Sequence, residues 1–219
     1  MTFALPAAVL WDMDGTLVDS EPYWMLAESE LVASFGGEWT AEDGRDLIGA
    51  GLYQSASIFQ RKGVELSATE IVDNLSQSVL GQLRRKVPWR PGVLSMMASL
   101  QDANIPSAIV TMSLRPAADF IASQLGIEFV VSGSDVANEK PHPEAFVSGA
   151  ALFGADANAC IAVEDSLNGL RSAVAAGAHT LVVPSHQHIP DSDEYALWST
   201  LEGRTASDLI ELFAERSAA

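Results

Sequence analysis

Short apolar runs that alternate with longer amphipathic stretches dominate most of the chain. Each run is bounded by polar or turn residues, as buried strands of a parallel sheet are: Ala7–Trp11, Ala108–Thr111, Phe129–Ser132, Cys160–Val163 and Thr180–Val183. Helical periodicity fills the intervals from residue 93 onward: Val93–Asp102, Pro116–Leu125, Pro143–Phe153 and Leu167–Ala176. This alternation predicts an α/β fold, with a Rossmann-like parallel sheet core and helices on both of its faces.

The pattern is different between the first and the second apolar run. Helix-like segments, and no convincing strand, lie there: Glu21–Phe35, Glu42–Ile48, Ser55–Lys62 and Thr69–Arg85. The chain then returns through Val87–Gly92, whose prolines and glycine are typical of a hinge. We therefore predict an α/β core over residues 1–20 and 87–219, with an all-helical cap domain inserted over residues 21–86. We expect the cap to close over the core about this hinge.

Composition and charge narrow the function. With 48% hydrophobic residues the chain can bury a core, and 12 lysines and arginines against 29 aspartates and glutamates give a formal net charge of −17. The negative electrostatic potential of such a chain repels nucleic acid and anionic membranes, so we expect neither as a partner. The start of the chain carries no basic residue and Asp12 interrupts its apolar run, which argues against a signal peptide or a membrane span. A single cysteine, Cys160, suits a reducing compartment, so we expect a cytoplasmic protein.

Polar side chains follow four of the predicted strands at the points where those strands end. They are Asp12 and Asp14 after the first strand, Thr111 at the end of the second, Lys140 after the third, and Glu164 with Asp165 after the fourth. Ligands of open parallel sheets bind beyond the carboxyl ends of the strands, so these side chains are candidates for one site. The negative net charge of the chain repels a phosphate ester, so a site for one needs a local positive charge, which Lys140 or a bound metal ion could supply.

This set of side chains has the parts that phosphoryl transfer requires. One carboxylate can attack phosphorus and form an aspartyl phosphate, and a second carboxylate two residues away can move the proton of the ester oxygen. Acidic oxygens would hold Mg²⁺, and Lys140 would neutralise charge on the transferring oxygens. Gly15 would let the backbone turn sharply beside the phosphoryl group. The sequence therefore predicts a phosphoryl-transfer site at this edge of the sheet.

Four motifs in this order resemble those of the haloacid dehalogenase superfamily: D-x-D-G-T at 12–16, a strand-ending Thr111, K-P-x-P at 140–143 and V-E-D-S at 163–166. The resemblance covers nearly the whole chain. It is strongest for phosphatases with a helical cap inserted after the first motif, in the β-phosphoglucomutase-like and sugar-phosphatase branch. LVDSEPYW after the first motif and the N-EKPHPE-F context of the lysine point to that branch. The resemblance implies Mg²⁺ as cofactor and a small-molecule phosphate ester as substrate.

The resemblance also implies a role for each motif residue. Asp12 would be the nucleophile and Asp14 the general acid and base. The residues that would bind the phosphoryl group are Thr111, Lys140 and Gly15. The metal ligands would be Asp12, Asp14 through its backbone carbonyl, Asp165 and, beside it, Glu164.

Two cap positions depart from the mutase of this branch. Trp24 stands where the mutase has a cap histidine, and Leu52 stands where it has a phosphate-binding arginine. A mutase must hold a second phosphate, so plain hydrolysis is favoured and a phosphosugar mutase is the alternative. A distal cation could still come from Arg45, Arg61 or Arg115. The candidates for selecting the leaving group are Tyr23, Trp24, Leu52 and Arg115.

Other functions fit the pattern less well. A dehalogenase needs no carboxylate at Asp14, and a phosphonate-cleaving relative would need a cap lysine near the first motif, where neither Lys62 nor Lys86 lies. A non-enzymatic phospho-acceptor module, the second alternative, is smaller and has no helical cap. His186 and His188 form an isolated H-x-H that we interpret as solvated surface. No heptad or apolar stripe indicates an interface, so we expect a monomer.

Overall fold

A six-stranded parallel sheet forms the centre of the molecule. The computed structural model describes residues 4–45, 47 and 51–217. The strands are β1 (Val9–Trp11), β2 (Ser107–Val110), β3 (Phe129–Val131), β4 (Ile161–Glu164), β5 (His179–Val182) and β6 (Ala196–Leu197). Their order is β3-β2-β1-β4-β5-β6, with parallel pairing throughout. Because the strand order reverses beside β1, this strand ends at a switch point, where ligands of such sheets bind.

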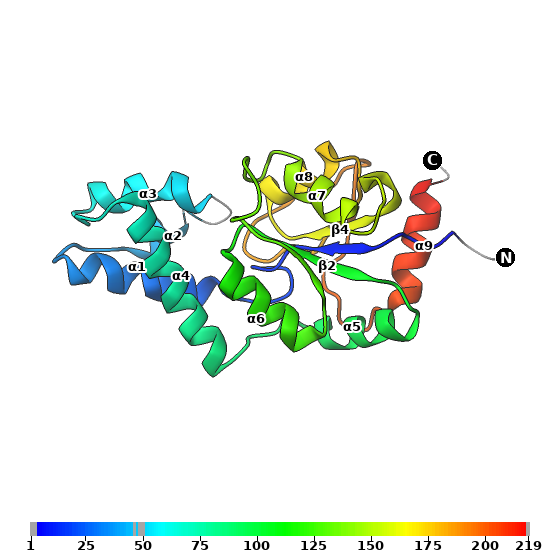
Figure 1. The fold of residues 1–219 in the computed structure, drawn as a ribbon, viewed down its shortest axis with the longest axis horizontal. Helices are drawn as coiled ribbons and strands as arrows, with labels where there is room; N and C mark the ends of the chain where they lie inside the picture. Colours follow the sequence, from blue (N-terminus) through cyan, green and yellow to red (C-terminus); the bar gives the residue numbers. More distant parts are fainter. Residues whose placement is uncertain (1–3, 46, 48–50, 218–219) are drawn as a thin grey trace.

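Apolar clusters cover both faces of the sheet. Val9 and Trp11 of β1 belong to one cluster and Leu10 to the other, as the alternation of strand side chains requires. The first face is covered by α5 (Val93–Asp102), α6 (Arg115–Leu125) and α9 (Ala206–Ser217), and the second by α7 (Glu144–Ala151) and α8 (Leu167–Ala175), as Figure 1 shows. A 3₁₀ turn, Ala157–Ala159, precedes β4. Burial of both faces explains why the strands are continuous apolar runs in the sequence.

Four described helices stand apart from the sheet, beyond the carboxyl ends of its strands (Figure 1): α1 (Glu21–Ser34), α2 (Ala41–Arg45), α3 (Leu52–Arg61) and α4 (Ala68–Arg85). We call them the helical unit. α4 begins with a capping box, in which the Ser67 hydroxyl accepts from the Glu70 N–H and the Glu70 carboxylate accepts from the Ser67 N–H. The buried side of α4 packs against α1 and α3 and so forms the core of the unit.

Two segments join the helical unit to the sheet and run side by side in opposite directions. Val18 and Trp89 form an antiparallel bridge. The Asp19 N–H donates to the Pro88 carbonyl at 2.8 Å, and the Arg90 N–H donates to the Leu17 carbonyl at 3.0 Å. The outgoing and returning chains therefore form one short hydrogen-bonded connection rather than two separate tethers.

The predicted α/β fold is confirmed, with differences at the ends of some elements. β6 is only two residues long and pairs with β5 at the sheet edge, too short to leave a periodic signal in the sequence. α3 begins at Leu52, before the predicted start at Ser55. α2 extends to Arg45, and its predicted end, Ile48, lies outside the described residues. Among the helices that the structure describes, none is long and apolar enough to cross a membrane.

Candidate active site

A buried lysine joins the ends of the three central strands. Asp12 follows β1 directly, and its backbone N–H donates to the Val163 carbonyl of β4 at 2.9 Å. The Lys140 Nζ lies 2.8 Å from Asp12 Oδ1 and 2.6 Å from Glu164 Oε1. It also donates to the Val110 carbonyl of β2 at 2.8 Å. One cation thus organises side chains that are far apart in the sequence.

The surroundings of Lys140 keep it charged. The residue is only 7% exposed, and its Nζ lies 4.8 Å from the centre of the Phe146 ring, a cation–π distance. Burial by itself would lower the pKa of Lys140, but the carboxylates of Asp12 and Glu164 raise it above its ordinary value. The lysine is therefore a fixed positive charge beside the candidate nucleophile.

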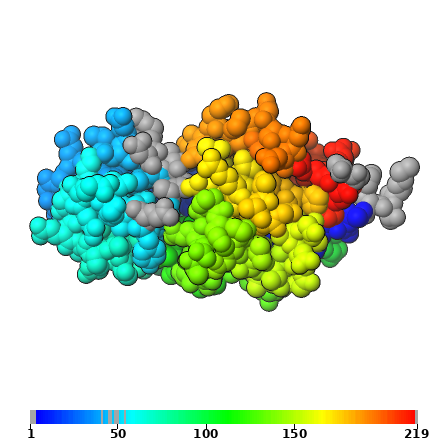
Figure 2. Space-filling model, turned by 90° about the horizontal axis from the view of Figure 1, so that it is seen from above, coloured from blue at the N-terminus to red at the C-terminus, as the bar shows by residue number. Residues whose placement is uncertain are grey.

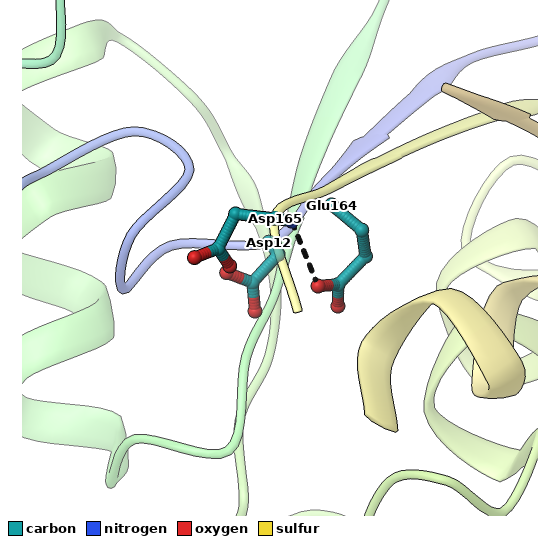
Figure 3. A group of neighbouring side chains, drawn as sticks. All are labelled: Asp12, Glu164 and Asp165. Atoms are coloured by element: carbon teal, nitrogen blue, oxygen red, sulfur yellow. Dashed lines mark hydrogen bonds between the residues drawn. The ribbon is translucent and has the colours of Figure 1, made fainter. Parts of the chain in front are cut away.

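Three buried carboxylates gather at this point: Asp12, Glu164 and Asp165 (Figure 3). One oxygen of each lies within 4.8 Å of the others. Burial and repulsion by Glu164 raise the pKa of Asp12 to about 7. Burial and repulsion by Asp12 raise the pKa of Asp165 well above its ordinary value. Three acids against one lysine leave excess negative charge, and their hard oxygen donors are those that Mg²⁺ prefers, so the residues fit that ion.

Both carboxylate oxygens of Glu164 have partners. Oε1 accepts from Lys140, and Oε2 accepts from the Asp165 backbone N–H and from the Ser166 hydroxyl, both at 3.2 Å. Ser166 is also the N-cap of α8, where its hydroxyl accepts from a backbone N–H of the first turn. The start of α8 therefore fixes Glu164, and Glu164 in turn fixes Lys140.

Two glycines make room for the acids at the end of β4. A Cβ at Gly169, in the first turn of α8, would lie 1.9 Å from the carboxyl carbon of Glu164. A Cβ at Gly15 would lie 2.1 Å from Asp165 Oδ2. Gly15 also has a φ of +86°, in the left-handed region, so the sharp turn expected there is present. Neither position can accept a larger side chain without displacing a carboxylate.

Asp14 accepts hydrogen bonds from four side chains. Ser113 and Thr111, after β2, donate to Oδ2 at 2.7 Å and 3.3 Å. Ser20 and Trp24, at the start of the helical unit, donate to Oδ1 at 2.6 Å and 3.2 Å. The orientation of this carboxylate therefore depends on the sheet side and on the helical unit together.

A cavity of about 140 Å³ lies between the sheet and the helical unit. Figure 2 shows the two parts side by side, with the helical unit in blue to cyan and most of the rest of the chain in green to red. The sheet side of the cavity includes Asp12, Asp14, Thr111, Ser113, Lys140 and Asp165. The side formed by the helical unit includes Trp24, Glu28, Leu52, Ser55, Phe59 and Leu75. Reactive polar groups and mostly apolar groups thus occupy opposite ends of one cavity.

The predicted aromatic and apolar selectors divide into two groups. Trp24 and Leu52 line the cavity. Tyr23 is not among the described lining residues, and its hydroxyl donates to the Lys86 carbonyl at 3.0 Å. Tyr23 therefore ties the start of α1 to the end of α4 instead of facing the leaving group.

The predicted distal cations lie elsewhere or are not described. Arg115 begins α6 and forms ion pairs with Asp119 and Asp135, which keep it out of the described lining of the cavity. Arg61 is exposed at the end of α3. The side chain of Arg45 lies outside the described part of the structure. The prediction that Arg115 selects the leaving group is therefore not carried forward, because its guanidinium has other partners.

The two histidines of the H-x-H pattern have different surroundings. His186 lines the cavity, and its Nε2 lies 2.9 Å from Asp19 Oδ1, so it is tied to the connection between the two parts of the molecule. His188 lines a separate groove with Trp198 and Arg204. The acidic cluster that could hold a metal among the described residues includes neither histidine. Both histidines are exposed, as the interpretation as solvated surface expects, and His186 in addition borders the cavity.

Three cavity or support residues were not predicted from the sequence. Ser113 follows Thr111 by two residues, so the same strand-end signal points to it. Gly169 is an isolated glycine inside a helical pattern, which often marks a close approach. Glu28 leaves no signal, because an acid in a helix normally faces solvent. Only the packing of the helical unit turns Glu28 toward the cavity.

Comparison with known proteins gives the class of this chain. A family model described as haloacid dehalogenase-like hydrolase matches residues 6–177. Hexitol phosphatase A of Escherichia coli (strain K12) is 31% identical over 204 residues, covering 86% of this chain and 88% of that protein. Hexitol phosphatase B of the same strain is 26% identical over 214 residues, covering 93% and 96%. The chain belongs to the haloacid dehalogenase-like hydrolases.

Solved structures agree with this fold. The structure of CbbY from Rhodobacter sphaeroides in complex with phosphate gives a TM-score of 0.85 at 24% identity, covering 94% of this chain and 99% of that one. A β-phosphoglucomutase from Clostridium difficile gives a TM-score of 0.83 at 19% identity, covering 98% and 100%. The superfamily recognised from the motifs is confirmed, and the chain is an enzyme of its phosphatase branch. The alternative of a non-enzymatic phospho-acceptor module is set aside.

Proposed function

We propose that this hydrolase releases phosphate from small phosphomonoesters in a Mg²⁺-dependent reaction that passes through an aspartyl phosphate on Asp12. One observation carries the proposal: Asp12 lies at the cavity between a fixed cation, Lys140, and a further acid, Asp165. A phosphoryl group in transfer needs a nucleophile and positive charge together, and this cluster can supply both.

The two chemical steps divide between Asp12 and Asp14. A carboxylate oxygen of Asp12 attacks phosphorus, and the bond from phosphorus to the leaving oxygen breaks while Asp14 gives that oxygen a proton. Water then attacks phosphorus and Asp14 takes its proton, which releases phosphate and restores the Asp12 carboxylate. Lys140 orients Asp12 and stabilises the transferring oxygens. Mg²⁺, held by Asp12, Asp165 and the backbone carbonyl of Asp14, would supply further positive charge at the phosphoryl oxygens.

The remaining predicted site residues have supporting roles in this proposal. Glu164, whose oxygens are engaged by Lys140 and by the start of α8, acts beside the metal by fixing the lysine. Thr111 lines the cavity and holds phosphoryl oxygens together with Lys140. Gly15 gives space for Asp165, because its own N–H already donates to the Val18 carbonyl at 2.7 Å.

We further propose that residues 21–86 act as a cap domain that closes over the sheet edge during turnover. The paired connection between Val18 and Trp89 suits a hinge, since both strands of the connection can bend together. Closure would exclude bulk water while the aspartyl phosphate forms.

The proposed substrate is a small sugar or sugar-alcohol phosphate, which agrees with the names of the two hexitol phosphatases. Hydrolysis is favoured over mutase activity, because no lysine or arginine of the helical unit is among the described residues that line the cavity. We propose a monomer, because the sequence has no heptad or apolar stripe that would indicate an interface. A cytoplasmic location suits its lone cysteine.

Phosphate release from p-nitrophenyl phosphate tests the proposal, with Mg²⁺ or with EDTA. Asp12→Asn should lower kcat by at least ~10³-fold, because the amide cannot act as the nucleophile. Asp73→Asn, which removes the same charge from the exposed side of α4, should leave turnover unchanged. Wild-type activity in Asp12→Asn, or full activity of the wild type in EDTA, would refute the mechanism.

A further inference from the structure

Glu28 is a buried acid on the side of the cavity that the helical unit forms, four residues along α1 from Trp24. It lies on α1, is only 6% exposed and lines the same cavity as Asp14. Its Oε2 accepts from the Trp39 indole N–H at 3.2 Å, the one hydrogen bond found for this carboxyl among the described residues. A carboxyl group buried with a single partner needs a further polar partner, and the cavity is where one can come from.

Trp39 is held by contacts that do not involve Glu28. Its ring stacks on Phe59 at a centroid distance of 4.7 Å, and the Lys62 Nζ lies 5.8 Å from its centre. α2 also approaches the carboxyl closely, since a Cβ at Gly44 would lie 3.2 Å from Glu28 Oε2. Glu28 therefore lies against Trp39 and α2, and Trp39 has contacts of its own that do not require the Glu28 carboxyl.

The charges along this end of the cavity have one sign. Glu21 is the other acid that the helical unit contributes to the lining. Lysine and arginine are absent from its described lining residues, and Lys140 on the sheet side is already paired with Asp12 and Glu164. Repulsion by Glu21 adds to the effect of burial, and the pKa of Glu28 is raised to about 8. His186 also lines the cavity, but its Nε2 lies 2.9 Å from Asp19 Oδ1. The far end of a bound ester would thus meet Glu28 without a described lysine or arginine to compensate it.

This arrangement treats neutral and anionic leaving groups differently. A hydroxyl group can donate to a carboxylate and can accept from a protonated carboxyl, so it can bind Glu28 in either state. Once Glu28 is ionised, a carboxylate or a second phosphate of the ligand would lose its hydration beside a like charge, at a cost that no described lysine or arginine offsets. Ser55, which is buried and lines the cavity, offers a second neutral partner.

We infer that Glu28 is a specificity-determining residue, which selects phosphomonoesters whose far end carries uncharged hydroxyl groups and rejects those whose far end carries an anion. This inference rests on the proposed phosphatase function and adds to it which class of leaving group the helical unit accepts. Bisphosphates and phosphorylated sugar acids are then poor ligands, although their phosphate ester is chemically the same.

A matched pair of ligands tests this selection. Sorbitol 6-phosphate and 6-phosphogluconate are open-chain hexose derivatives that differ at the far carbon, which bears a hydroxyl in one and a carboxylate in the other. Their inhibition constants are measured against p-nitrophenyl phosphate, and their binding is followed separately by tryptophan fluorescence. At pH 9, above the pKa of about 8 for Glu28, the carboxyl is ionised, and the wild type should bind the polyol at least ~10-fold more tightly than the acid.

At this pH Glu28→Gln keeps the size of the side chain and removes its negative charge. This variant should reduce the preference at least ~5-fold, mainly by tighter binding of 6-phosphogluconate. Glu28→Asp keeps the acid and should retain the preference, which separates charge from packing. Glu30→Gln is the control, because Glu30 is two residues further along α1 and exposed, and the preference should not change.

The outcomes separate the two proposals. Equal affinity for both ligands in the wild type, or an unchanged preference in a folded Glu28→Gln variant, would overturn the inference even if phosphate release is normal. No binding of the polyol would overturn it as well. Absence of phosphate release from every ester, with the fluorescence preference intact, would instead refute the proposed function and leave the selectivity of the cavity standing.

Discussion

The two ends of the cavity are built in opposite ways. At the sheet end, every oxygen described for Glu164 and Asp14 has a side-chain or backbone donor, and one lysine connects three strands. At the helical end, apolar side chains predominate and a single hydrogen bond from Trp39 holds the buried acid. Several hydrogen bonds thus fix each of these two carboxylates at the sheet end, whereas the Glu28 carboxyl at the helical end can still form further hydrogen bonds.

Under the proposed function, this difference separates chemistry from selection. Charge stabilisation in phosphoryl transfer requires groups that do not reorganise, so a dense network at strand ends suits the reacting end. Selection of a leaving group requires only a suitable shape and a few polar contacts, and these can change without disturbing the nucleophile. Trp24 is the exception, because it lines the helical end and also donates to Asp14.

The largest expected effect comes from the sheet end. Gly169→Ala would put a Cβ where the Glu164 carboxyl lies, so Glu164 and then Lys140 must move. A displacement of about 1 Å at a reacting group can cost ~10²-fold, and we expect kcat to fall by about that factor. Steady-state kinetics measures it.

Gly81→Ala is the matched control for this substitution. Gly81 lies inside α4 with no atom within 4 Å of the added Cβ, so the variant should be more stable by about 1 kcal/mol and fully active. Normal turnover in Gly169→Ala would mean that the position of Glu164 does not matter for catalysis.

A smaller effect, on stability, is expected at the helical end. The pKa of Glu28, about 8 in the folded protein against an ordinary value of 4.5, means that the folded state keeps a proton that the unfolded chain releases. The stability from this proton is complete below pH 4.5 and is lost as the pH rises toward 8. Between pH 6 and pH 8 the loss should be on the order of 2 kcal/mol.

Urea unfolding of wild type and Glu28→Gln at pH 6, 7 and 8 measures this loss as the difference between the two proteins. Acids common to both, such as Asp12 and Glu21, cancel in that difference. Glu30→Gln should differ from the wild type by a constant amount over the same range. A pH-independent difference for Glu28→Gln would show that the carboxyl is ionised and hydrated in the folded protein.

The smallest effect is expected for Trp24, which lines the helical end of the cavity and also donates to Asp14. Trp24→Phe removes one of the four donors to Asp14 and keeps an aromatic ring in the cavity. Loss of one hydrogen bond is worth about 1 kcal/mol, so kcat should fall about 5-fold with little change in KM. Trp198→Phe, in the groove near β6, is the control and should be neutral. Unchanged kcat in Trp24→Phe would mean that the serine and threonine hydroxyls suffice to hold Asp14.

The sheet end was largely predictable, and the helical end was not. Asp12, Thr111 and Asp165 stand at the ends of apolar runs, and parallel strands bring their carboxyl ends to one edge whatever the details of packing. Arg115 and Tyr23 also stand near that edge in the sequence, but Asp135 and the Lys86 carbonyl engage them elsewhere. Side-chain partners of this kind depend on distances that no periodicity encodes.

The sequence alone determined the class of fold, the superfamily and the acids and lysine that meet at the end of β1. Those features follow from local patterns, since strand alternation and motif spacing are properties of neighbouring residues. Only the tertiary structure decided which face of α1 closes the cavity, and hence that Glu28 is buried in it with Trp39 as its partner. The physical reason is that burial and the resulting pKa depend on the packing of α1 against α2 and α4, which the chain specifies only as a whole.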